Sequence, residues 1–203
     1  MARRSSNEVS FDDNGLCVFG DGGPAELHVY DYMSSKCEID GEIVSKINKA
    51  LSLASYRGVS ELHVKLHSEG GDLHAGFAIH DMFLEWQRGS AATTTCTVVG
   101  SAFSAAALIT QAFDTRVMYP NAVMMLHAAS LGLSGTTQTL HRWSVCYASM
   151  ESEMFRIFRA RLRDKYREDV TRMIAHDLPL SASTCVLYGL ADSIVGAGEA
   201  VTI

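Results

Sequence analysis

Ser104 is the first residue whose type and position suggest chemistry. A β-rich run over 93–99 enters a Gly-Ser turn, and small residues then begin an apolar segment of helical character. A serine at such a junction lies near the unpaired backbone N–H groups of a helix N-terminus. An exposed hydroxyl beside free amides is what a nucleophile needs when its attack generates an oxyanion. The alternative is a small residue that only permits close packing, and a short motif alone leaves both readings open.

Other chemically useful groups follow predicted strands. Alternation over 62–67 leads into Gly70 and Gly71, and adjacent glycines permit a turn that leaves backbone amides bare for a ligand. His127 ends a further predicted strand, and Asp177 lies in a linker before a predicted helix. Each of these also has a plain structural explanation, as a turn, a structural histidine or a solvated acid.

The periodicity predicts a mixed set of elements to hold these residues. The predicted helices span 39–54, 75–86, 140–163, 168–175 and 182–188. The predicted strands span 27–32, 62–67, 93–99, 115–119, 122–126 and 191–195. Strands that alternate with helices favour an α/β fold with parallel pairing. We expect a flexible N-terminal arm or short hairpin over 1–26 and a single domain over 27–203.

The long predicted helix over 140–163 is apolar on more than one side. One stripe steps by three and four residues through Leu140, Trp143, Tyr147, Met150, Met154 and Ile157. A second stripe adds Val145, Cys146, Phe155, Phe158 and Leu162. Such a helix is buried in its own core or packs partly against another subunit, and the pattern leaves both open.

Composition excludes several classes of protein. A net charge of −6 argues against a general nucleic-acid binder. No segment has the apolar core of a signal peptide or the length of a membrane span. The five cysteines are scattered without Cys-x-x-Cys spacing, which predicts reduced thiols in the cytoplasm. His63 and His67 share a strand face but lie too far apart for easy joint ligation, so we expect neither a metal nor a cofactor.

Four ordered segments resemble the Clp protease proteolytic subunit, ClpP, and its phage-encoded relatives. Residues 68–81 are similar to the family's Ser-Pro-Gly-Gly-x-x-x-Ala-Gly-x-x-Ile-x-Asp segment, and 100–107 to its Gly-x-Ala-x-Ser-x-x-Ala segment. Residues 120–127 resemble Pro-Asn-x-x-x-Met-x-His, and 177–192 resemble Asp-x-x-x-Ser-Ala…Tyr-Gly-Leu-x-Asp. The resemblance implies a ClpP/crotonase-like spiral of β-β-α units with a long protruding helix.

The same resemblance implies a function. Carried over residue by residue, Ser104 is the nucleophile, His127 the general base and Asp177 the group that orients the imidazole. The implied activity is a serine endopeptidase that cleaves peptides and unfolded proteins inside a self-compartmentalised chamber. In the family the helix matching 140–163 interdigitates between two stacked heptameric rings. The implied location is the cytoplasm of a bacterium or of a phage-infected cell.

Further site residues follow from the resemblance alone. The backbone N–H groups of Gly71 and Ala105 are expected to form the oxyanion hole. Gly70, Asp72 and Leu73, beside the glycine pair, are expected to contact the substrate.

The sequence also departs from the family pattern. Glu69 replaces the usual proline, and Ala105-Ala106 replaces Met-Gly, as in phage head-maturation relatives. In the family, alternate positions of the preceding strand carry aromatic side chains that line an outer pocket for an AAA+ unfoldase loop. Here those positions are His63 and Lys65. A hydrated lysine disfavours burial of an apolar loop, so we expect weak or absent unfoldase docking.

Two other functions remain as alternatives. A crotonase-like acyl-CoA enzyme shares the fold and an oxyanion hole of backbone amides, but it does not need a Ser-His-Asp set. An inactive structural subunit of a mixed ring would be expected to lose a member of that set. Because Ser104, His127 and Asp177 are all present, the protease is favoured over both.

Overall fold

A mostly parallel sheet forms the centre of the protein, seen here in a computed structural model that describes residues 16–18, 23–29, 38–128, 132 and 134–196. Within these residues eight strands form one sheet. Its main path is β1 (Leu16–Val18), β2 (Pro24–Val29), β4 (Glu61–Ser68), β6 (Thr93–Phe103), β7 (Thr115–Met118) and β10 (Ser193–Ile194). Beside β6 lies β8 (Val123–Met125), which pairs with β9 (Pro179–Ser181). Only the β1–β2 and β8–β9 pairs among these are antiparallel, which confirms the expected α/β fold.

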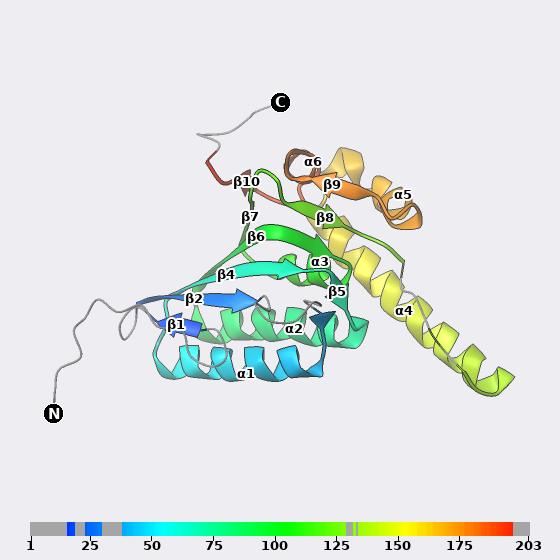
Figure 1. Cartoon of the computed structure of the whole chain (residues 1–203), viewed down its shortest axis with the longest axis horizontal. Helices are drawn as coiled ribbons and strands as arrows, with labels where there is room; N and C mark the ends of the chain where they lie inside the picture. The colour runs from blue at the N-terminus through cyan, green and yellow to red at the C-terminus, as the bar shows by residue number, and fades with distance from the viewer. Residues whose placement is uncertain (1–15, 19–22, 30–37, 129–131, 133, 197–203) are drawn as a thin grey trace.

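Helices cover one face of this sheet. The helices α1 (Gly41–Tyr56) and α2 (Leu73–Ser90) lie side by side along it in Figure 1. The short helix α3 (Ala105–Thr110) packs against α2 and β6, and all six of its residues are buried. A separate two-stranded ladder joins β3 (Glu38–Ile39) to β5 (Gly70–Gly71). The β4 side chains alternate, so that Leu62, Val64 and Leu66 are buried in the core.

The remaining elements lie on the side of the sheet that carries β8, β9 and β10. They are α4 (Thr137–Arg161), a 3₁₀ turn (Asp164–Tyr166), α5 (Asp169–Ala175) and α6 (Ala182–Tyr188). The Thr137 end of α4 projects away from the sheet, whereas its other end returns to it (Figure 1), and α4 contacts α5. Met154 and Phe158 are buried near that base, but Trp143 is 44% exposed and Val145 58% exposed. The predicted excess of apolar surface is therefore real on the outer half of the helix.

Local signals in the sequence place several element ends correctly. Asp40 caps α1, since its carboxylate accepts the backbone N–H groups of Glu42 and Ile43. Ser181 caps α6 in the same way, and Gly189 ends it with a left-handed backbone.

Several boundaries differ from the sequence expectation; β6, for example, continues to Phe103 and does not end at residue 99. The strand predicted over 27–32 already begins at Pro24 and is described as far as Val29, whereas 30–32 lie outside the described residues; β1 pairs antiparallel with it. Residues 16–18 and 24–26 of the expected arm thus belong to the sheet, while 1–15 and 19–22 lie outside the described residues. The long helix predicted over 140–163 spans 137–161, because Thr136 caps it earlier and Leu162 already has extended backbone.

Candidate active site

Ser104 occupies a strained turn between β6 and α3. Its backbone has φ 54° and ψ −121°, a conformation that residues other than glycine rarely adopt. Its N–H donates to the carbonyl of Met125 at 2.9 Å, which holds the turn against the end of β8. The side chain makes no capping hydrogen bond to α3, so the hydroxyl is not used to stabilise the helix.

His127 follows β8 and lies near this turn. Because β6 and β8 pair in parallel with Phe103 beside Met125, the residues after both strands leave the sheet at the same edge. The imidazole is half-buried, and its Nδ1 donates to the carbonyl of Ala128 at 2.8 Å. That bond puts the ring proton on Nδ1 and leaves Nε2 as a proton acceptor.

Asp177 precedes β9, two residues before its first residue. The antiparallel register pairs Val123 with Ser181 and Met125 with Pro179, so the start of β9 lies beside the end of β8 that leads to His127. Asp177 is exposed and has φ 47°, another left-handed backbone. Among the described residues, no hydrogen bond joins His127 to Asp177 or to Ser104. The fold thus gathers the three residues at one edge of the sheet without linking their side chains.

Of the two glycines, Gly70 packs against the Ser104 turn and Gly71 packs against β3. A Cβ on Gly70 would lie 2.6 Å from the Phe103 carbonyl oxygen and 2.8 Å from the Ser104 Cβ. A Cβ on Gly71 would lie 2.4 Å from the Ile39 carbonyl oxygen. Both residues also have positive φ, at 95° and 148°. Only glycine therefore allows β5 to fit between β3 and the serine turn.

The N–H of Gly71 points away from β3. In a parallel ladder a residue bonds to the neighbours of its partner, not to the partner itself. Gly71 is the partner of Ile39, and the Ile39 carbonyl accepts from Asp72 at 2.8 Å. The Gly71 amide therefore points to the other edge of β5, where α3 packs.

The other residues expected beside the glycines have structural partners. Asp72 caps α2, since its carboxylate accepts the N–H of Ala75 at 2.8 Å. The Leu73 side chain is buried in the core. Substrate contacts by Gly70, Asp72 and Leu73 stay predictions, and the last two would use backbone atoms or require side-chain movement.

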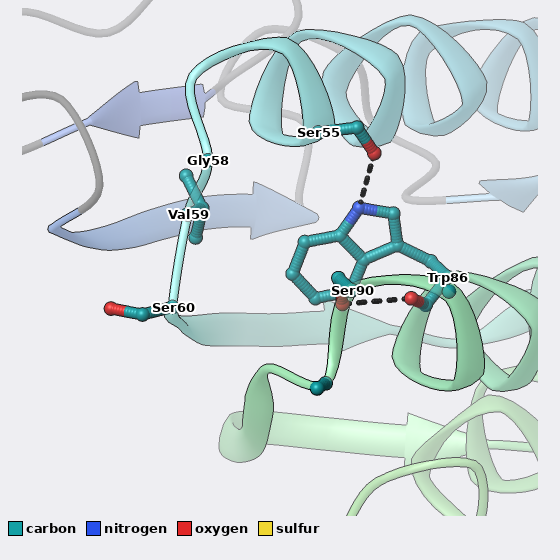
Figure 2. A pocket seen from close by; sticks show the side chains of 8 residues that line it. Ser55, Gly58, Val59, Ser60, Trp86 and Ser90 are labelled. Atoms are coloured by element: carbon teal, nitrogen blue, oxygen red, sulfur yellow. Dashed lines mark hydrogen bonds between the residues drawn. The ribbon is translucent and has the colours of Figure 1, made fainter.

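A pocket of about 410 Å³ lies at the opposite end of the strands. It is lined by Ser55, Gly58, Val59, Ser60, Trp86, Gly89, Ser90 and Ala91. Figure 2 shows the Trp86 indole N–H donating to the Ser55 hydroxyl, at 2.9 Å, across the space between α1 and α2. Ser60 and Ala91 precede β4 and β6, whereas Ser104 follows β6, so this pocket is separate from the serine turn.

Sequence reasoning missed the residues that support the turn from behind. Ser68 is buried and its hydroxyl accepts the N–H of Gly70 at 3.1 Å. His67 accepts the backbone N–H of Ser101 at 3.0 Å. The strand alternation had marked His67 only as a weak metal candidate; among the described residues no cluster of three metal-ligating side chains occurs.

The chain belongs to the Clp protease family, whose sequence model matches residues 26–198. The ATP-dependent Clp protease proteolytic subunit of Deinococcus radiodurans is 26% identical over 153 residues, which cover 74% of this chain and 72% of that protein. A point mutant of ClpP1 from Listeria monocytogenes has the same fold, with a TM-score of 0.70. That match covers 84% of this chain and 90% of the other at 22% identity. The fold and family implied by the four sequence segments are therefore confirmed.

Proposed function

We propose that this Clp-family protein is a serine endopeptidase with Ser104 as nucleophile, His127 as general base and Asp177 as the orienting acid. The observation that carries the proposal is the strained Ser104 backbone at a strand-to-helix turn, with a hydroxyl that takes no part in capping. Such strain persists only where the surrounding structure imposes it, and it clusters at functional sites. The β6, β8 and β9 registers, which bring the other two residues to the same edge, add support.

The proposed reaction proceeds through an acyl-enzyme. Nε2 of His127 takes the Ser104 hydroxyl proton as Oγ attacks the peptide carbonyl carbon. The N–H groups of Gly71 and Ala105 bind the resulting oxyanion. The C–N bond then breaks, and the imidazolium gives its proton to the departing amine. Water, activated by the same imidazole, hydrolyses the ester and frees Ser104.

Catalysis in this scheme requires one exchange of hydrogen bonds. The His127 Nδ1 proton is now held by the Ala128 carbonyl. For Asp177 to orient the ring, the Nδ1–H group must donate its hydrogen bond to the Asp177 carboxylate in place of the Ala128 carbonyl. The pairing of β8 with β9, which brings the two segments side by side, supports this exchange.

We also propose that α4 completes a self-compartmentalised assembly of two stacked heptameric rings. Trp143 and Val145 expose apolar area on a helix that projects from its own sheet (Figure 1). Contact with α4 of a second copy would bury that area. Polypeptide substrates would then reach the Ser104 turns inside the chamber.

A cytoplasmic setting fits the described thiols, and we include it in the proposal. Cys96, Cys146 and Cys185 are free. Burial raises the pKa of the Cys185 thiol to about 12, so it stays protonated and unreactive. Burial also raises the pKa of the Cys96 thiol, which is fully buried.

One observation favours a second function, that of an inactive subunit in a mixed ring. The His127 proton goes to Ala128, and no described hydrogen bond connects it with Ser104 or Asp177. An inactive subunit would keep the fold and the strained turn without turnover.

Labelling with a fluorophosphonate probe separates the two functions. The protease is expected to form a covalent adduct, which peptide mass spectrometry should locate on Ser104. Ser55→Ala, at the far end of the strands, is the matched control and should label like the wild type. A folded wild-type assembly that gives no adduct would overturn the protease proposal and support the inactive subunit.

A further inference from the structure

The strand that leads to Ser104 changes its neighbour half-way along. Residues 95–98 of β6 pair with β7, whereas residues 101–103 pair with β8. On the other side, Leu66 of β4 pairs with Val98 and Ser68 pairs with Ala102. One residue of β4, His67, therefore faces three residues of β6, and extra residues on one strand bend it.

The His67 imidazole occupies this bend. Its Nδ1 accepts the backbone N–H of Ser101 at 3.0 Å, and the Ser101 hydroxyl lies 3.2 Å from the same nitrogen. The ring also packs on Gly100, where a Cβ would come within 2.7 Å of Nδ1. A bulge takes backbone groups out of the ladder, and His67 supplies the acceptor that the Ser101 amide needs.

The next residue of β4 holds the other half of the site. Ser68 accepts the N–H of Gly70, and Gly70 packs against the Ser104 Cβ. Consecutive side chains of one strand thus hold the strand that ends at Ser104 and the glycine turn that lies against it.

We propose that His67 is a positioning residue for the Ser104 nucleophile. It touches none of the reacting atoms, and it acts as a hydrogen-bond acceptor that keeps the end of β6 bent toward β8. The inference rests on the proposed function, because it assigns His67 a part in the reaction of Ser104. A ring that accepts at Nδ1 carries its proton on Nε2, so the neutral imidazole is the working form.

Two substitutions at His67 test the proposal. His67→Ala removes the acceptor, whereas His67→Asn can place a carbonyl oxygen near the position of Nδ1. We expect His67→Ala to slow fluorophosphonate acylation of Ser104, and kcat for a fluorogenic peptide, by about 10- to 100-fold with KM little changed. His67→Asn should recover most of that loss. If His67 only supported folding, His67→Ala would yield less folded enzyme, and the folded part would not show a lowered kcat at an unchanged KM.

His80→Asn is the matched control. His80 is also buried, but its Nδ1 contacts Asp81 on the same helix, α2, and not the bend. Its acylation rate per folded subunit should equal that of the wild type. Should His67→Ala fail to fold, Gly100→Ala tests the same point, because its methyl group displaces the imidazole that it meets at 2.7 Å.

The possible outcomes separate this inference from the proposed function. A folded wild type without an adduct on Ser104 refutes the function itself. If the wild type is labelled and folded His67→Ala is labelled at the same rate, only the inference is overturned. Where His67→Ala does not fold, full-rate labelling of Gly100→Ala has the same consequence. Equal slowing in His67→Ala and His67→Asn also overturns it, since the acceptor would then not be what matters.

Discussion

The serine turn and the outer half of α4 differ in how completely one chain supports them. Around Ser104, α3 is fully buried, Gly70 packs against the turn, and the backbone hydrogen bond from Ser104 to Met125 fixes the turn to β8. On the outer half of α4, Trp143 and Val145 have about half of their surface in solvent. The comparison teaches that the chain packs the serine turn within its own core, whereas it leaves apolar side chains exposed on the outer half of α4.

The two regions meet at the base of α4. The Arg161 side chain donates to the carbonyl oxygens of Gln111 and Phe113, which follow α3. Burial lowers the pKa of this guanidinium, and nearby Arg116 adds to the effect. The inner half of α4 is therefore fixed to the protein core, and its exposed apolar side chains lie on the outer half.

The largest expected effect comes from the serine turn. Ser104→Ala should lower peptide hydrolysis on the order of 10⁴-fold or more, because it removes the attacking atom. His127→Ala should cause a similar loss, since members of a triad act as a unit. Both variants should keep the wild-type circular dichroism spectrum and native mass. Undiminished turnover by purified Ser104→Ala would contradict the triad.

The next effect concerns α4. Trp143→Glu combined with Val145→Glu should separate the stacked rings while leaving the fold intact, because burial of like charges at the contact is costly. Native mass spectrometry would measure the change. Met154 is unsuitable for this test, because it is 3% exposed and belongs to the core of its own subunit.

Tyr56→Glu is a control for the α4 variants. Tyr56 is another exposed aromatic side chain, at the end of α1, and its replacement should not separate the rings. The α4 contact would be refuted by a wild type that is only a monomer, or by α4 variants that keep the full assembly.

A smaller effect is expected at the ion pair between the nearly buried Arg116 and the half-buried Asp192. The Arg116 guanidinium donates to both Asp192 carboxylate oxygens, at 3.0 and 2.6 Å, and to Gln111. Asp192→Asn leaves a nearly buried charge uncompensated, and we expect the free energy of unfolding to fall by about 2 kcal/mol. Asp164→Asn, in an exposed pair with Arg167, is the control and should leave the urea midpoint unchanged.

The same pair predicts a pH dependence. Burial alone would raise the pKa of Asp192, but hydrogen bonds and charge from Arg116 outweigh it and hold the pKa below its usual value. The contribution to stability is therefore present above the ordinary aspartate pKa of about 4 and is lost as pH falls through the lower folded value. Urea unfolding from pH 6 to pH 2 should show this loss in the wild type and not in Asp192→Asn. Parallel pH curves for the two proteins would refute it.

The smallest expected effect is the response to an unfoldase. The Lys65 ammonium lies 3.1 Å from a Glu26 carboxylate oxygen, and the His63 Nε2 lies 2.7 Å from the Thr97 hydroxyl oxygen. These polar contacts occupy the strand face where the family carries aromatic side chains. Burial lowers the pKa of His63, which favours the neutral ring. Adding a cellular Clp unfoldase and ATP should leave degradation of a stably folded, tagged protein near background. Efficient ATP-dependent degradation would show instead that neighbouring residues rebuild the docking pocket.

Much of the fold could be predicted because its signals are local. Caps such as Asp40 and Ser181 bond to amides two or three residues away, and the alternation in β4 depends only on the period of a strand. The turn at Ser104 and the paired glycines were visible for the same reason. The four segments that resemble the Clp family include these features in the family's order along the chain. The roles of His127 and Asp177 stay predictions.

The tertiary structure decided what depends on residues far apart in the sequence. No local pattern shows that β6 exchanges β7 for β8, or that His67 accepts from Ser101, 34 residues later. The short strands β3 and β5 are two residues each, too short for any periodicity, and exist because they pair. The apolar stripes of α4 left open whether its side chains pack in the core or against another subunit. The tertiary structure shows that Met154 is buried in the core and Trp143 is exposed. Local order follows from neighbouring residues, whereas these contacts exist only once the whole chain has folded.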